Sequence, residues 1–264
     1  MDASFWLKFS LSFIVGSLWV TLTTLSAERF GSKVGGLLGG LPSTVVIALL
    51  FIGLTQSPME AAQTTTVMPL AQGLNGLFLL TFMLFIPRGL FAGLVSAMLA
   101  WSLQSTLLYL LNIDFFWVSV LGWLALLLFC SVVVMKWMKV PAIDRIQVSY
   151  PPRQIIWRAL FGGAVIALAV LMGKLGGPLI GGIFGSFPAM FLSTLVITYK
   201  TGAASFSRAV GKSMLISGLI NVPIYEILVR YLYPPLGLSA GTVIALACSF
   251  VTGYLTYLYI AKII

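Results

Sequence analysis

The chain carries one sequence pattern twice, at an offset of 146 positions. The ungapped pairs include a methionine, Met68 with Met214, and an asparagine, Asn75 with Asn221. The other pairs are Gly31 with Gly177, Gly35 with Gly181, Gly36 with Gly182, Gly39 with Gly185 and Pro42 with Pro188; after a two-residue slip, Gly89 and Gly93 match Gly237 and Gly241. Repeats around glycine- and proline-broken apolar segments are typical of membrane transporters. The repeat therefore points toward transport.

The composition places the chain in a membrane. Hydrophobic residues occupy 60% of the 264 positions, charged residues occupy 8%, and the mean hydropathy is +1.08. Soluble globular domains lie well outside this range. We therefore expect an all-α polytopic membrane protein with no separate soluble domain.

Nine apolar runs are long enough to form transmembrane helices. The first four match the last four, and the fifth has no partner. We expect a first four-helix repeat over residues 1–113, a linker helix and loop over 114–145, and a second four-helix repeat over 146–264. The approximate bounds of the spans are 5–26, 34–56, 62–86, 89–111, 115–138, 154–173, 177–200, 210–232 and 238–261.

The unpaired fifth span makes the two repeats inverted, because five crossings bring the second repeat to the opposite side of the membrane. With the 139–158 loop in the cytoplasm, twelve of the fifteen Lys and Arg residues lie inside, and Lys8, Lys174 and Arg230 lie outside. This distribution follows the positive-inside rule. It predicts an amino terminus outside the cell and a carboxyl terminus in the cytoplasm.

A glycine- and proline-rich motif interrupts spans two and seven. It ends at Pro42 in the first repeat and at Pro188 in the second. Proline removes a backbone donor and clashes with the carbonyl four residues earlier, and lipid cannot satisfy the polar atoms that this frees. From a cytoplasmic start near Lys33, Pro42 lies about 13 Å deep, close to the middle of a hydrocarbon core about 30 Å thick. We expect two broken helices at the membrane midplane, although close helix packing also accounts for the glycines.

Asn75 and Asn221 lie midway along the third span of each repeat, at depths equivalent to the prolines. A buried carboxamide needs partners for both its donor and its acceptor. Each asparagine either caps carbonyls released by the proline break near it, or lines a solute or ion site on the pseudo-two-fold axis. The two interpretations are compatible. The candidate substrate-binding residues are Gly39, Pro42, Ser43, Thr44, Asn75, Gly185, Pro188 and Asn221.

Ionisable groups inside the spans are few. Glu226 is the deepest carboxylate, and Arg230 follows at i+4, where the two side chains can pair. A coupling-ion or proton role for Glu226 is the alternative. Arg208 and Lys212 lie one turn apart at the inner end of span eight, where we expect them to snorkel to the headgroups. Attraction of an anionic substrate is their alternative role.

Enzymatic chemistry finds no support in the sequence. The chain has no histidine, which removes the common zinc sites and the serine–histidine triads. The net charge of +9 comes from single basic residues at helix ends and forms no nucleic-acid-binding patch. We expect no enzyme activity, no metal, no cofactor and no nucleic-acid partner. The expected partners are membrane lipids and a small-molecule or ion substrate; self-association into a homo-oligomer stays open.

The second repeat resembles the GlpM-like family of small bacterial inner-membrane proteins, which are single four-span units. The residues that carry this resemblance are Gly182, Phe187, Pro188, Gly202, Ser213, Met214, Pro223 and Tyr225. The resemblance implies a prokaryotic inner-membrane location and an origin by duplication and fusion of a four-span unit. It implies no substrate and no catalytic residue. The first repeat departs from the pattern at Leu41 and Gln56.

Three classes of function stay open. The favoured prediction is a transporter or channel for a small solute or ion, with a midplane site formed by the broken helices. A lipid flippase or scramblase is the second class, and a non-transporting assembly or regulatory protein is the third. A polar cavity would favour the first two classes over the third, and a side opening to the bilayer would favour the second.

Overall fold

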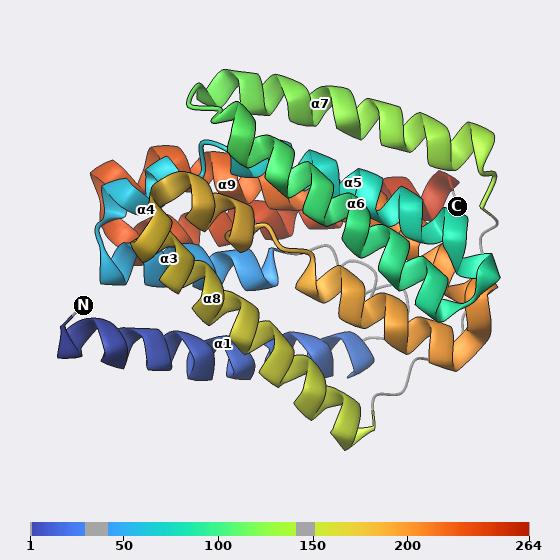
Figure 1. The fold of residues 1–264 in the computed structure, drawn as a ribbon, viewed down its shortest axis with the longest axis horizontal. Coiled ribbons are helices and arrows are strands. Elements are labelled where there is room, and N and C mark those ends of the chain that lie inside the picture. The colour runs from blue at the N-terminus through green and yellow to red at the C-terminus, as the bar shows by residue number, and fades with distance from the viewer. Residues whose placement is uncertain (1, 30–41, 141–150, 264) are drawn as a thin grey trace.

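The computed structural model of the chain describes residues 2–29, 42–140 and 151–263. These residues are mostly helical, and no strand occurs among them. Most helices run along the long axis of the molecule, and the two chain ends lie at opposite ends of the bundle (Figure 1). The all-helical fold predicted from composition is thus confirmed.

The first half of the chain is a series of separate helices, and their bounds follow the predicted spans closely except around residues 55–68. The span predicted over 34–56 is described from residue 42 onward, so Gly39 lies outside the described residues. The elements are α1 (Ala3–Arg29), α3 (Ser43–Thr55), α4 (Pro58–Thr64), α5 (Met68–Phe85), the 3₁₀ turn η1 (Ile86–Arg88), α6 (Leu90–Leu111), α7 (Phe116–Val132) and the π-helical turn η2 (Val133–Trp137).

The span predicted over 62–86 is two helices, α4 and α5, rather than one. The backbone N–H groups of Thr65 and Thr66 donate to carbonyls three residues earlier, which tightens the end of α4. Pro69, in the first turn of α5, has no N–H with which to continue α4. At the other end of α4, the Ser57 hydroxyl caps the helix by accepting a hydrogen bond from the N–H of Glu60. The sequence analysis missed this break.

The second half consists of two long helical elements that are interrupted by changes of direction. α8 (Pro152–Gly185) turns at Gly177, and α9 (Ala189–Ile263) turns at Gly202–Ala203 and again at Gly237. Gly177 and Gly237 have positive φ angles of 75° and 74°, which glycine adopts without steric cost. These turns fall at the borders of the predicted spans 154–173, 177–200, 210–232 and 238–261. Residues 186–188 connect α8 to α9 without helical structure.

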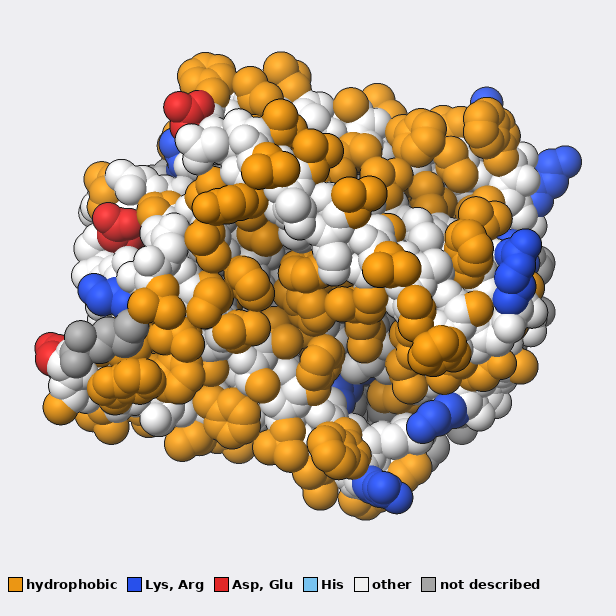
Figure 2. All heavy atoms as spheres, viewed as in Figure 1, with side chains coloured by type: hydrophobic (Ala, Val, Ile, Leu, Met, Phe, Trp, Pro, Cys, Tyr) orange, Lys and Arg blue, Asp and Glu red, His pale blue; other side chains and the backbone are white. Residues whose placement is uncertain are grey.

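Several helices are long and apolar enough to cross a membrane. They are Ala3–Leu25, Met68–Arg88, Leu90–Leu111, Phe116–Trp137 and the interrupted stretch Pro152–Thr256. The visible face of the molecule is covered by hydrophobic side chains over its middle, while most charged side chains gather near its two ends (Figure 2). Large exposed apolar surfaces of this kind are unusual for a soluble monomer. The described part of the chain therefore has the character of a membrane protein.

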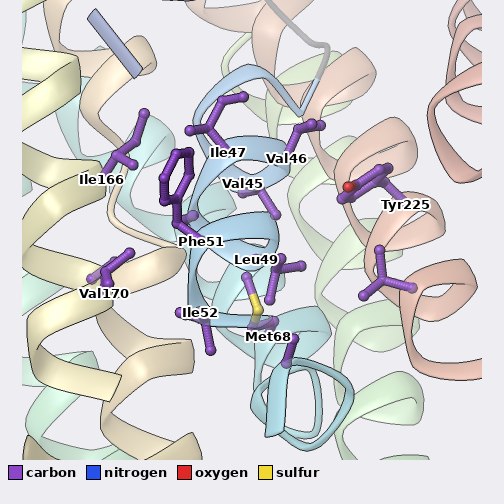
Figure 3. Packing of buried hydrophobic residues seen from close by; sticks show 14 of the residues in the cluster. Val45, Val46, Ile47, Leu49, Phe51, Ile52, Met68, Ile166, Val170 and Tyr225 are labelled. Atoms are coloured by element: carbon purple, nitrogen blue, oxygen red, sulfur yellow. The ribbon is translucent and has the colours of Figure 1, made fainter. Parts of the chain in front are cut away.

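Helix α3 lies in the centre of the bundle. Its residues from Ser43 to Leu49 are all buried, as expected for a helix that is apolar on every side. Ile166 and Val170 of α8 lie on one side of α3, and Tyr225 of α9 lies on the other (Figure 3). α3 therefore carries its first polar residues into the protein interior.

Candidate functional site

A small cavity lies where the beginning of α3 meets the connection between α8 and α9. Its volume is about 30 Å³, which leaves room for about one or two water molecules. Pro42 and Pro188 both contribute to it, together with α5 and the middle of α9. The lining residues are Pro42, Ser43, Thr44, Val45, Gln72, Asn75, Ser186, Phe187, Pro188, Met190, Phe191 and Val222.

The two prolines occupy equivalent positions at the cavity. The Pro42 carbonyl accepts the N–H of Val46 at 2.9 Å, and the Pro188 carbonyl accepts the N–H of Leu192 at 2.9 Å. Each proline therefore stands immediately before a helix and starts its hydrogen-bond ladder. The N-terminal ends of α3 and α9, which carry partial positive charge, both begin at the cavity.

Asn75 is held by two hydrogen bonds that use its amide nitrogen. Its Nδ2 donates to the Ser186 carbonyl at 2.8 Å and to the Gln72 Oε1 at 3.0 Å. A carbonyl oxygen only accepts, so the nitrogen has to face Ser186, which fixes the orientation of the carboxamide. The Asn75 Oδ1 is buried and has no hydrogen-bond partner within the described structure. Asn75 thus caps the α8–α9 connection and still keeps a free acceptor.

The Asn75 cap crosses between the two halves of the chain. The capping interpretation placed each asparagine beside the proline break near it, whereas Asn75 of α5 holds the break that precedes Pro188. The helical period specifies which residues share a face of α5, but it does not specify which neighbouring helix that face meets.

Two polar residues of the cavity, Gln72 and Ser186, escaped the sequence analysis. Gln72 is buried and precedes Asn75 by three positions, so the two carboxamides share one face of α5. This spacing within an apolar run was the signal available in the sequence. The Ser186 Oγ is also buried, without a hydrogen-bond partner among the described residues.

Asn221 is not among the described residues that line the cavity. Its Oδ1 accepts a hydrogen bond from the Thr256 hydroxyl at 3.4 Å, and its backbone carbonyl accepts one from the Ser249 hydroxyl at 3.4 Å. Asn221 therefore packs against the last segment of α9. Its neighbour Val222 reaches the cavity instead.

The glycines of the second motif serve mainly to bring backbones together. A Cβ atom on Gly181 would lie 2.8 Å from the Gly173 Cα, and one on Gly182 would lie 2.6 Å from the Thr64 carbonyl oxygen. Close packing thus accounts for both. Gly185 ends α8 and has looser surroundings. A Cβ atom on Gly185 would lie 3.4 Å from the Cε atom at the flexible tip of Met68, which is an ordinary contact distance.

The predicted pair of Glu226 and Arg230 is not formed. The Arg230 guanidinium donates to the Thr66 hydroxyl at 2.9 Å and to the Ala62 carbonyl at 3.3 Å, and it lies 4.4 Å above the Phe116 ring. The break between α4 and α5 leaves acceptors in need of donors, and Arg230 supplies them. Glu226 is fully buried, and neither of its carboxyl oxygens has a hydrogen-bond partner in the described part of the chain.

Arg208 and Lys212 are not among the described residues that line the cavity. The Lys212 Nζ donates to the Val140 carbonyl at 3.1 Å and so joins α9 to the segment that follows η2. Arg208 is half-buried one turn earlier. Within the described ranges, no group of three or more His, Cys, Asp or Glu residues could hold a metal ion.

One protein-family model matches most of the chain. The family described as "Protein of unknown function (DUF3147)" matches over residues 9–113 and 155–262. No curated protein and no solved structure gives a match. The chain therefore belongs to the DUF3147 family.

Proposed function

We propose that this protein is a membrane transporter or channel for a small solute or ion, and that its binding site is the cavity between the two proline breaks. The observation that carries the proposal is the free, buried Oδ1 of Asn75 in that cavity. A buried acceptor without a donor costs about 1–3 kcal/mol, and such groups call for a functional explanation. A bound solute or ion supplies the missing partner.

The proposed architecture is a set of nine transmembrane helices in two inverted four-helix repeats, over residues 1–113 and 146–264. The two segments matched by the family fall within these repeats. Two glycines paired by the sequence repeat, Gly89 and Gly237, both have positive φ angles and each precedes the last helix of its repeat. The matching positions of Pro42 and Pro188 before α3 and α9 give further support.

The proposed orientation has the carboxyl-terminal end of the bundle in the cytoplasm of a prokaryotic cell. An odd number of crossings agrees with chain ends at opposite ends of the bundle (Figure 1). Acidic side chains are seen near the end that holds the amino terminus, and most visible basic side chains gather at the other end (Figure 2). The positive-inside rule then assigns the basic end to the cytoplasm. A bacterial inner membrane is also what the GlpM-like resemblance implies.

The cavity limits what can bind in this conformation. A volume of about 30 Å³ fits a water molecule or a dehydrated ion. A larger solute requires the two halves to move apart, as in alternating access around an inverted repeat. The site offers helix N-termini toward negative groups and the Asn75 and Ser186 oxygens toward positive groups, so a polar or zwitterionic solute also suits it.

The cavity also bears on the other two classes of function. A purely packing role for the motif does not explain why the Asn75 Oδ1 and the Ser186 Oγ are buried without hydrogen-bond partners among the described residues. A flippase or scramblase would be favoured by a site that Arg208 and Lys212 line for a phosphate headgroup, and neither lies among the described lining residues. Transport of a small solute or ion is therefore the better-supported proposal.

Uptake by the purified protein in liposomes tests this function. The assay screens labelled monovalent ions, amino acids and small organic acids against protein-free liposomes. Asn75→Leu should abolish uptake of any solute found, because the site loses its acceptor, while Asn221→Leu should retain it. Melting temperatures of both variants show whether lost uptake follows lost folding. Full uptake by folded Asn75→Leu would exclude this cavity as the site.

A further inference from the structure

Glu226 is a carboxyl group buried without a countercharge. Its side chain is 0% exposed, and neither oxygen has a hydrogen-bond partner among the residues that the structure describes. An ionised carboxylate at such a position is costly unless a cation or a proton neutralises it. The group therefore needs a positively charged ligand that the surrounding protein does not supply.

The groups that face Glu226 offer no such charge. On its own helix, Arg230 is turned away toward α4 and Phe116, and the adjacent Tyr225 carries a neutral phenol that is also buried. From α5, the carboxamide of Gln72 lies beside the carboxyl group without forming a hydrogen bond to it. Neither carboxyl oxygen accepts a hydrogen bond from a Lys or Arg side chain of the described helices.

Glu226 is connected to the cavity on two sides. Val222 lines the cavity and precedes Glu226 by one helical turn on the same face of α9, a distance of about 6 Å along the axis. Gln72 lines the cavity from α5 and lies next to the carboxyl group. Its Oε1 accepts the hydrogen bond from Asn75, so its Nε2 is the atom left to face Glu226. A polar path thus runs from the carboxyl group through Gln72 to Asn75.

We infer that Glu226 is a proton-binding site of the membrane interior, which exchanges its proton through the cavity and couples transport to the proton gradient. The inference rests on the proposed function. The carboxylate takes up a proton from water on one side of the membrane and becomes a neutral acid, and it releases the same proton to the other side after the conformational change. A metal ion needs a shell of several oxygen ligands, whereas Gln72 turns a nitrogen toward this carboxyl group.

Labelling with an apolar carbodiimide tests the site without knowledge of the solute. The reagent reacts with protonated carboxyl groups in apolar surroundings, and mass spectrometry of the full-length protein in liposomes locates the adduct. We expect labelling of Glu226 in the wild-type chain at acidic pH and a fall of about tenfold per pH unit on the alkaline side of a single-proton titration. The control variant Asp114→Asn, which removes an exposed carboxyl group, should leave the profile unchanged.

Three results would overturn the inference. Labelling that does not change with pH would show a permanently protonated structural group, and no labelling at any pH would show that the carboxyl group is sealed off. Protection by NaCl but not by KCl, at constant pH, would identify a sodium ion as the ligand in place of the proton.

The variant Glu226→Gln separates this inference from the proposed function. For a solute found in the uptake screen, it should lose accumulation driven by a pH gradient and retain exchange at equal pH, because the amide keeps the shape but cannot release a proton. If uptake changes neither with the pH gradient nor with the Glu226→Gln substitution, the protein is a transporter but Glu226 is not its proton-binding site. If the labelling of Glu226 depends on pH but the protein transports no solute in the screen, the proton-binding site is supported and the proposed transport function is contradicted.

Discussion

The Nδ2 atom of Asn75 lies 2.8 Å from the backbone carbonyl oxygen of Ser186, a residue 111 positions later in the chain. This hydrogen bond joins α5 to the connection between α8 and α9, and both residues are buried. The carbonyl sits two residues before Pro188, where the helical ladder is interrupted. One side chain from the first half of the molecule therefore stabilises the broken backbone of the second.

The first prediction concerns the stability that this bond provides. Asn75→Ala should lower the free energy of unfolding by about 1–3 kcal/mol, because the Ser186 carbonyl is left buried without a donor. The measurement is thermal or denaturant unfolding in detergent. Thr106→Ala is the matched control, since it removes an exposed hydroxyl that bonds its own helix and should change stability by less than about 0.5 kcal/mol. Equal effects of both changes would show that the cap contributes nothing.

The second prediction separates packing glycines from site glycines. Gly182→Ala should destabilise the protein by about 1–3 kcal/mol, because the new methyl group would be forced against the Thr64 carbonyl oxygen. Gly185→Ala should be tolerated, because the tip of Met68 can move aside. Unfolding curves of both variants check the difference. If Gly185→Ala keeps normal stability but loses uptake, Gly185 belongs to the binding site.

The sequence predicted the parts of this site that depend on backbone chemistry. Pro42 and Pro188 each precede a helix, because proline lacks a backbone N–H in any context. Both also line the cavity. The contacts that depend on how each helix is rotated against its neighbours could not be predicted from the sequence. The i+4 spacing of Glu226 and Arg230 permits an ion pair, but Arg230 donates instead to Ala62 of α4 and to Thr66 in the turn after it. The end of α4 at this turn was not predicted. Asn221 likewise meets Thr256 rather than the cavity.

The third prediction tests where the Arg230 guanidinium makes its interactions. A double-mutant cycle between Arg230→Met and Phe116→Leu should give a coupling energy of about 0.5–2 kcal/mol, as expected for a cation–π contact. The equivalent cycle between Arg230→Met and Glu226→Gln should give a value near zero, because the two side chains do not pair. Unfolding free energies of the wild type and of the three variants in each cycle provide the test. A large coupling to Glu226 and none to Phe116 would restore the ion pair expected from the sequence.

The last prediction concerns topology, on which the proposed inverted repeat depends. Twelve of the fifteen Lys and Arg residues fall on one side when the 139–158 loop is cytoplasmic, and the chain ends lie at opposite ends of the bundle (Figure 1). Positively charged loops resist translocation, so a reporter fused after Ile264 should be cytoplasmic and one fused before Met1 should be external. Pairs of reporters active only inside or only outside the cell measure this directly. Both ends on one side would require an even number of crossings, and the two halves could then not be inverted copies joined by the single linker helix α7.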